Sequence, residues 1–202
     1  DLVANVAGMA SLVPIEQVTA DLWRGCVDSN LSAIVLSTAA VWPIFKKQGS
    51  GLIVNISSMA SFDPFPGLDI YGAAKVAVNL FTRSTARHGA EIGVRAVCIA
   101  PGAVETPMLR GLFGLDQIPR AKTLTPEQVA STICDCITGH RDFESGGPPD
   151  STQGAKSHNR DNRKIMNNVK KITKNGFKKY YWQIKRAFCN KIHSFSCCFY
   201  LI

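Results

Sequence analysis

The segment GLIVNISSMASFDPFPGLDIYGAAK, residues 51–75, joins a buried strand to the start of a long helix. Its first seven residues are mostly apolar and partly β-branched, which predicts a strand covered on both faces, as in a parallel sheet. A proline-rich loop follows, and an alanine-rich pattern then predicts a helix over residues 71–88 that ends at Gly89. A strand followed by a helix is the repeating unit of an α/β domain.

The same alternation continues on both sides of this segment. Residues 1–7 and 94–100 are predicted to form two more buried strands, and residues 19–47 a long helix. A last helix is predicted from Pro126, because Thr125 before it can cap its first turn. The predicted fold class is therefore α/β with a parallel sheet.

Positive charge is concentrated at the C-terminal end of the chain. The net charge is +8, but residues 1–150 carry 11 Lys or Arg against 14 Asp or Glu, and residues 151–202 carry 12 against 1. We therefore expect a domain over residues 1–145 and a basic tail over residues 146–202, with no nucleic-acid-binding domain. Two interpretations of the tail remain open: a basic amphipathic helix that contacts an anionic membrane or an acidic partner, or translated non-coding sequence.

The cysteines and the apolar runs predict the compartment. The seven cysteines are odd in number and have no Cys-x-x-Cys spacing, which favours a reduced, cytoplasmic protein without a metal site. We find no run of about 18 to 20 unbroken apolar residues and no signal-peptide pattern. A membrane-spanning protein is therefore not expected.

Tyr71 and Lys75 are four residues apart in the predicted helix, so their side chains lie on one face. A tyrosine that acts as acid and base near neutral pH needs its pKa lowered by roughly 3 units, or about 4 kcal/mol. A lysine cation about 4 Å away supplies roughly that energy at an effective dielectric constant of about 20. Ser58 follows its strand at the carboxyl end, the edge where open α/β sheets bind ligands. These three residues are therefore candidates for acid–base chemistry.

Together with these residues, further motifs in the same order resemble the short-chain dehydrogenase/reductase family. The first strand ends in Asn-Val-Ala-Gly, where Val6 replaces the second Asn of the family's Asn-Asn-Ala-Gly, and Asn30 lies in the first long helix. Ser58 and Tyr-x-x-x-Lys follow, and a Pro-Gly-x-x-x-Thr loop comes after the third strand, with Ala100 where many members have Asn. The resemblance covers about residues 1–138.

The resemblance implies a Rossmann-like doubly wound parallel sheet, of which this chain carries the C-terminal half, and an oxidoreductase that transfers hydride between a nicotinamide and a carbonyl or alcohol substrate. It implies NAD or NADP as cofactor of the full-length protein and a homo-oligomer built through the helices over residues 19–47 and 71–88. The implied catalytic residues are Asn30, Ser58, Tyr71 and Lys75. The implied cofactor-binding residues are Asn5, Ala7, Gly8, Tyr71, Lys75, Pro101, Gly102, Val104 and Thr106.

The family also implies a role for each catalytic residue. Tyr71 would exchange a proton with the substrate oxygen, and Ser58 would donate a hydrogen bond to the same oxygen. Lys75 would lower the pKa of Tyr71 and bind the nicotinamide ribose. Asn30 would distort its helix and hold a water that links Lys75 to solvent.

Each assignment also has a purely structural alternative. Ser58 could only cap a turn, and Ser57 beside it could take the catalytic role instead. Asn30 could be solvated in mid-helix, and Asn5 could only tie neighbouring strands together. Tyr71 and Lys75 could form an ordinary exposed pair, and Pro101-Gly102 could be a simple turn.

The sequence lacks the glycine-rich turn that holds the dinucleotide phosphates and that the family carries before the Asn-Ala-Gly strand. Because the chain starts at Asp1, within that strand, we expect a fragment whose first strand exposes an apolar edge. We expect such a fragment to bind neither NADH nor NADPH with useful affinity, and a titration that gives micromolar binding would contradict this. The alternative function is an inactive remnant, and a glycine-rich strand and turn upstream would decide between the two.

Overall fold

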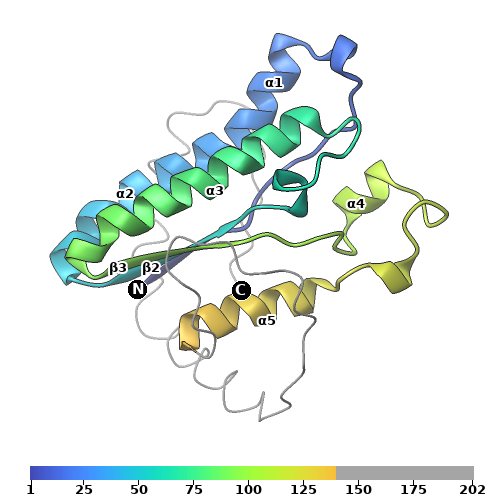
Figure 1. Ribbon diagram of the computed structural model, residues 1–202. Coiled ribbons are helices and arrows are strands. Elements are labelled where there is room, and N and C mark those ends of the chain that lie inside the picture. Colours follow the sequence, from blue (N-terminus) through green and yellow to red (C-terminus); the bar gives the residue numbers. More distant parts are fainter. Residues whose placement is uncertain (140–202) are drawn as a thin grey trace. The chain divides into compact units, whose positions relative to one another are not determined.

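The computed structural model describes residues 1–139 and contains a three-stranded parallel sheet between helices (Figure 1). The strands are β1 (Leu2–Asn5), β2 (Gly51–Ile56) and β3 (Val94–Ile99), in the order β1-β2-β3. The three predicted strands and their parallel pairing are confirmed, although each observed strand is shorter than predicted. The predicted tail over residues 146–202 lies outside the described residues.

The first long helix is interrupted in its middle. The helix α1 (Ala20–Val27) passes through a π-turn, η2 (Asp28–Ser32), into α2 (Ala33–Gln48). Thr19 caps α1, since its hydroxyl accepts from the amide N–H of Leu22, and Gly49 ends α2 in the left-handed conformation. The helix predicted over residues 19–47 is confirmed in extent, with the π-turn at its centre.

The remaining helices follow the predicted order. The catalytic candidates lie on α3 (Asp69–Gly89), which begins two residues before the predicted start. The short α4 (Pro107–Leu112) follows β3, and α5 (Pro126–Thr138) begins with the predicted capping box of Thr125 and Gln128. Short 3-10 turns also occur at η1 (Ile15–Gln17), η3 (Met59–Ser61), η4 (Ala90–Ile92) and η5 (Arg120–Lys122).

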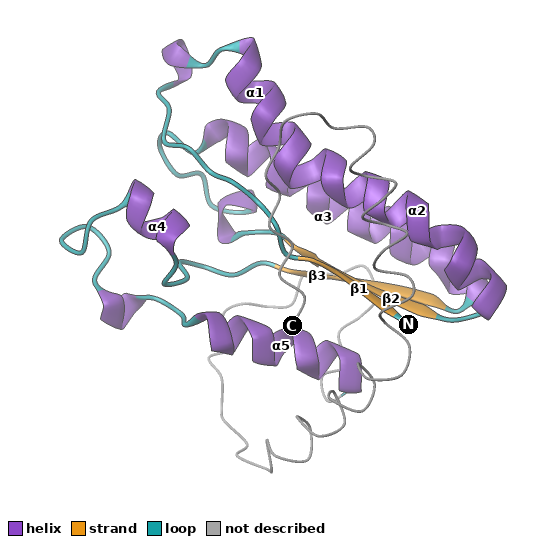
Figure 2. Cartoon of the chain, turned by 180° about the vertical axis from the view of Figure 1, so that it is seen from behind, coloured by secondary structure: helices purple, strands orange, loops and turns teal. Residues whose placement is uncertain are grey.

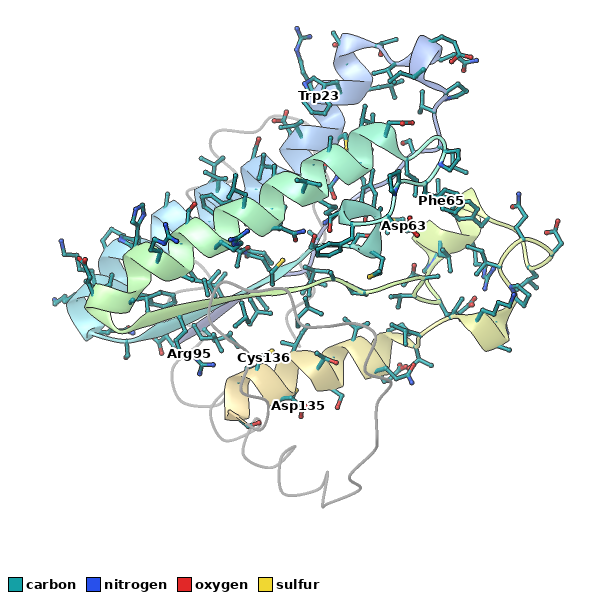
Figure 3. The ribbon with its side chains drawn as sticks, viewed as in Figure 1. Trp23, Asp63, Phe65, Arg95, Asp135 and Cys136 are labelled. Carbon is teal, nitrogen blue, oxygen red and sulfur yellow. The ribbon has the colours of Figure 1, made fainter. Side chains whose placement is uncertain are left out.

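The sheet is covered on both faces, which explains its continuous apolar strands. The helices α2 and α3 lie on one face, and α5 lies on the other (Figure 2). Val54 of β2 and Val97 of β3 are almost completely buried, and Cys136, on the side of α5 that faces the sheet in Figure 3, packs against them. Burial on both faces is typical of a parallel α/β sheet.

Tight glycine turns lie at the amino end of the sheet. Gly93 before β3 has a φ of +70°, and a Cβ there would collide with the carbonyl oxygen of Gly49. A Cβ on Gly89 would collide with the carbonyl oxygen of Val94. Glycine is therefore required where these backbones meet. The amino end of the sheet is closed by this packing, whereas the carboxyl ends of the strands continue into longer loops.

A ladder of polar side chains joins the helices to the sheet near those carboxyl ends. The Ser37 hydroxyl donates to Asn5 Oδ1 (2.7 Å), and Asn5 Nδ2 donates to Asn55 Oδ1 (2.7 Å). On the other side, Asn55 Nδ2 donates to the Thr82 hydroxyl of α3 (2.9 Å). Buried polar groups paired in this way specify a unique arrangement. The ladder fixes β1, β2, α2 and α3 relative to one another, and it confirms that Asn5 ties neighbouring strands.

Candidate functional site

The predicted site residues gather at the carboxyl edge of the sheet. Ser58 lies two residues after the end of β2, and Pro101 lies two residues after the end of β3. The two segments are tied together because the amide of Met59 donates to the carbonyl of Pro101 (2.9 Å) and that of Ser57 to the carbonyl of Ile99 (2.7 Å). This edge is where ligands bind in open α/β sheets.

Tyr71 and Lys75 are buried on the face of α3 that meets this edge. Tyr71 is 9% exposed and Lys75 is 3% exposed, so the alternative of an ordinary exposed pair is wrong. The Lys75 ammonium lies 5.6 Å from the centre of the Tyr71 ring and donates to the carbonyl of Ile56 (2.9 Å) at the end of β2. The hydrogen bond to β2 holds the lysine at the sheet rather than at the phenol oxygen.

Burial shifts the pKa of both residues toward their neutral forms. It raises the pKa of Tyr71, against the opposing effect of a hydrogen bond with Ser58, and it lowers the pKa of Lys75 to about 8. In the protein without ligand the pKa of Tyr71 is therefore raised, which is opposite to the lowered value that we expected. Loss of hydration is the largest cause of this shift. Near neutral pH the Tyr71 phenol carries its proton.

Of the two candidate serines, Ser58 is the one that meets Tyr71. Its hydroxyl interacts with the phenol, and it also accepts from the amide of Ala60 (3.2 Å) at the start of η3. The expected turn-capping contact is therefore present together with the contact to Tyr71. The Ser57 hydroxyl points to the backbone of α3 instead and donates to the carbonyl of Lys75 (3.1 Å).

Asn30 lies within the π-turn and is completely buried, so the solvated alternative is wrong. Its Nδ2 donates to the carbonyls of Met9 (2.8 Å) and Cys26 (2.9 Å), and its Oδ1 accepts from the amide of Met9 (3.3 Å). The predicted distortion of the helix is confirmed. The side chain holds the segment after β1 by these bonds, whereas a water linking it to Lys75 stays a prediction.

Gly8 brings the end of the β1 segment close to Asn30 and Lys75. A Cβ on Gly8 would lie 2.8 Å from Asn30 Oδ1 and 3.4 Å from Lys75 Nζ. The backbone therefore passes beside the lysine at a point where a side chain would displace the asparagine. A buried lysine and a tyrosine hydroxyl beside a glycine backbone are suited to the hydroxyl groups of a ribose. The residues present thus fit the nicotinamide end of a dinucleotide.

The loop after β3 is organised by Thr106 and Val104. Thr106 caps α4, since its hydroxyl accepts from the amide of Leu109 (3.2 Å), and it also donates to the carbonyl of Val104 (3.2 Å). Val104 forms an isolated parallel bridge with Leu124. A Cβ on Gly102 would meet no atom within 4 Å, so the loop is open on that side.

A cluster of ion pairs surrounds Glu105, and no motif in the sequence indicates it. Its carboxylate binds Arg110 through both oxygens, and it also contacts Arg120 (3.6 Å) and the Thr123 hydroxyl (3.2 Å). The bidentate bond to Arg110 is the first cause that lowers the pKa of Glu105 to about 2. These residues have no helical or strand spacing, so no periodic pattern indicates their contact. The cluster closes the base of the loop over residues 106–124.

Aromatic packing joins the loops that follow β2 and β3. Phe65 lies after η3 and faces the region of α4, as Figure 3 shows, and its ring packs edge-to-face on Phe113 with centroids 5.4 Å apart. Among residues 1–139, no three His, Cys, Asp or Glu side chains gather as metal ligands.

Residues 1–114 match the protein family described as short chain dehydrogenase. A 3-oxoacyl-[acyl-carrier-protein] reductase of Synechocystis sp. is 37% identical over 136 residues, which are 66% of this chain and 55% of the relative. The human dehydrogenase/reductase SDR family member 4 is 37% identical over 163 residues, 73% of this chain and 59% of the relative. The chain thus spans between half and two thirds of the length of these relatives.

Solved structures with bound dinucleotides have folds similar to that of this chain. A 3-ketoacyl-(acyl-carrier-protein) reductase from Brucella melitensis, complexed with NADH, has a TM-score of 0.67 at 27% identity, over 73% of this chain and 64% of that one. ElxO with NADP bound has a TM-score of 0.66 at 26% identity, with the same two coverages. These similarities confirm the Rossmann-like fold predicted from the motifs.

Proposed function

Because the chain belongs to the short-chain dehydrogenase/reductase family, we propose that it carries the catalytic side chains of an NAD(P)-dependent oxidoreductase that interconverts a carbonyl compound and an alcohol. The observation that carries this proposal is the meeting of Ser58 with a buried Tyr71 at the carboxyl edge of the sheet, one helical turn from Lys75. All four positions of the proposed catalytic set carry the residues that the family uses there. We therefore do not propose the inactive remnant.

The residues present would hold the nicotinamide end of the cofactor. Lys75 and Tyr71 would bind the ribose hydroxyls beside Gly8, with Asn5 and Ala7 in the same segment. The loop after β3 would contact the carboxamide; its residues in this role are Pro101, Gly102, Val104 and Thr106. When bound, NAD or NADP accepts or supplies the hydride, and the protein positions the reacting carbon.

In this proposal Tyr71 is the acid for carbonyl reduction. Burial raises its pKa, so its Oη holds a proton near neutral pH and can pass that proton to the substrate oxygen. The Ser58 hydroxyl donates to the same oxygen and stabilises the charge that develops on it. Lys75, whose pKa is lowered to about 8, remains mostly charged at pH 7 and stabilises the tyrosinate that is left. These are the protonation states that reduction of a carbonyl requires at neutral pH.

Asn30 would keep the proton path of Lys75 in place. Its amide fixes the Met9 backbone next to Gly8, and the π-turn around it leaves backbone groups out of the regular helical pattern. Groups of this kind can bind a water, and such a water would link Lys75 to solvent. We propose this as the role of Asn30 beyond its structural contacts.

We propose that a second copy of the chain covers α2 and α3. Both helices bury one side on the sheet, yet Leu36, Val76 and Leu80 of the outer side are 53%, 49% and 62% exposed. Exposed apolar patches of this kind mark interaction surfaces.

The stretch Ala20–Gln48 is also, within residues 1–139, long and apolar enough to cross a membrane, with a mean hydropathy of 1.2 over 18 residues. Because α2 packs on the sheet through buried residues such as Phe45, we assign its apolar outer side to protein contact.

We also propose a cytoplasmic location. Within residues 1–139, Cys26, Cys98 and Cys134 are free thiols. Free thiols support a reducing compartment.

The replacement Tyr71→Phe in the full-length protein tests the proposed reaction. It removes the proton donor and leaves the ring, so we expect turnover of NAD(P)H with small ketones to fall about 100-fold or more. Cofactor affinity, measured by fluorescence titration, should change far less than turnover, by about tenfold at most, because one ribose hydrogen bond is lost while Lys75 remains. Turnover that is unchanged in Tyr71→Phe would overturn the proposal.

A further inference from the structure

Asn79 extends the stripe of functional residues on α3. It follows Lys75 by four residues, as Lys75 follows Tyr71, so the three side chains lie on one side of the helix. Asn79 is one helical turn too far along the helix to reach Tyr71 directly. Its contacts lead instead to the loop that carries Ser58.

A directed chain of hydrogen bonds runs from β3 through Asn79 to Ser58. The Cys98 thiol donates to Asn79 Oδ1 (3.3 Å), which leaves Nδ2 to donate to the Ser61 hydroxyl (2.8 Å). The Ser61 hydroxyl in turn donates to the carbonyl of Ser58 (2.6 Å). The backbone amide of Ser61 donates to the same carbonyl (3.0 Å). The hydroxyl and the amide of Ser61 thus both donate to the Ser58 carbonyl and hold its backbone in place.

The direction of these bonds depends on Asn79 being a donor. A serine hydroxyl has a single proton, and Ser61 uses it on the Ser58 carbonyl. Asn79 can satisfy the Ser61 oxygen only by donating to it. A group at position 79 that only accepts would compete for that proton and draw it away from Ser58.

We propose that Asn79 is a positioning residue for Ser58, and that it acts through Ser61 to aim the Ser58 hydroxyl at Tyr71 and the substrate oxygen. The inference rests on the proposed role of Ser58 in carbonyl reduction. Ser58 lies at the junction of β2 and η3, where its backbone is extended, so the bonds on its carbonyl fix the direction of the side chain. A misplacement of about 1 Å at a reacting group costs on the order of 100-fold in rate.

The first test is Asn79→Asp, which keeps the shape of the side chain and removes its donor. We expect kcat of the full-length protein with a ketone and NADPH to fall about 10-fold, with KM for NADPH within twofold. Ser61→Ala removes the next link and should give a similar loss, whereas Ser61→Thr keeps a hydroxyl and should restore most of kcat. The double variant with both Asn79→Asp and Ser61→Ala should lose no more than either single variant, because both break one chain.

A second measurement does not depend on activity. Amide hydrogen exchange of the 202-residue chain, followed by NMR, reports directly on the Ser61 N–H that bonds to Ser58. We expect Asn79→Asp to accelerate exchange at Ser61 about 10-fold and to leave the amides of β2 unchanged. Ser84→Ala, which removes an exposed hydroxyl from the same helix, is the matched control and should change neither exchange nor kcat.

The outcomes separate this inference from the proposed function. If Tyr71→Phe abolishes turnover but Asn79→Asp and Ser61→Ala keep wild-type kcat and exchange, the positioning role is wrong. It is also wrong if the two losses multiply in the double variant, or if exchange rises throughout the chain, because Asn79 is then only a packing residue. If Tyr71→Phe keeps full turnover, the proposed function fails, and the exchange at Ser61 still decides whether Asn79 holds the Ser58 backbone.

Discussion

Lys75 should make the stability of this protein depend on pH in the alkaline range. Its ammonium is 3% exposed, and burial lowers its pKa from 10.5 to about 8. In the unfolded chain the lysine keeps its ordinary pKa, so between pH 8 and 10.5 the unfolded state binds more protons than the folded state. Stability must therefore rise with pH across this window.

The size of this change in the free energy of unfolding follows from the lowered pKa of Lys75. A pKa lowered from 10.5 to about 8 corresponds to roughly 3 kcal/mol between the fully charged and fully neutral limits. Most of this, roughly 2–3 kcal/mol, is gained between pH 7 and pH 10. Lys75→Met keeps the length of the side chain and removes the charge, so it should remove this part of the pH dependence.

The assay is urea unfolding of wild type and Lys75→Met at pH 7 and at pH 10. We expect the wild type to gain roughly 2–3 kcal/mol relative to the variant when the pH is raised. Both proteins keep the same cysteines and tyrosines, and because Cys26 and Cys98 interact electrostatically with Lys75, the difference between the proteins includes the effect of the lysine on these two thiols. If the two proteins change stability in parallel, the Lys75 ammonium is not desolvated and the account of its charge is wrong.

Three further predictions concern neighbouring parts of the structure. Gly8→Ala should destabilise the chain by about 1–3 kcal/mol in thermal unfolding, because its Cβ displaces the buried amide of Asn30, and an unchanged midpoint would contradict the close approach. The Glu105 carboxylate, whose pKa is lowered to about 2, should stay charged and protect residues 106–124 from pepsin down to pH 3. In Glu105→Gln this loop should be cut already at pH 4. Equal cleavage of both proteins would show that the cluster does not hold the loop. Leu80→Asp should lower the mass measured by sedimentation from an oligomer to a monomer, and a monomeric wild type would exclude the proposed interface.

The sequence was sufficient to predict the backbone elements because their signals are local. The apolar run over residues 51–57 and the capping box at Thr125 each depend on a few neighbouring residues, and both are confirmed. A distortion of the helix at Asn30 was predicted through the family resemblance, whereas no pattern in residues 28–32 indicates that it is a π-turn.

The hydrogen bonds that the side chains form could not be predicted in the same way. Spacing places Tyr71 and Lys75 on one face, but it shows neither that the ammonium bonds to Ile56 nor that burial raises the pKa of Tyr71. The bonds from Asn79 to the Ser58 loop depend on which strand lies beside which helix. Such contacts between distant segments become visible only once the chain is folded.

Transfer of deuterium from NADPH or NADH that carries deuterium at both C4 positions to a ketone, measured by mass spectrometry, tests the proposed reaction most directly. The full-length protein should give an alcohol with one deuterium on the former carbonyl carbon, and Tyr71→Phe should slow this transfer about 100-fold or more. An alcohol product without deuterium, or transfer at the wild-type rate in Tyr71→Phe, would contradict hydride transfer with Tyr71 as the proton donor.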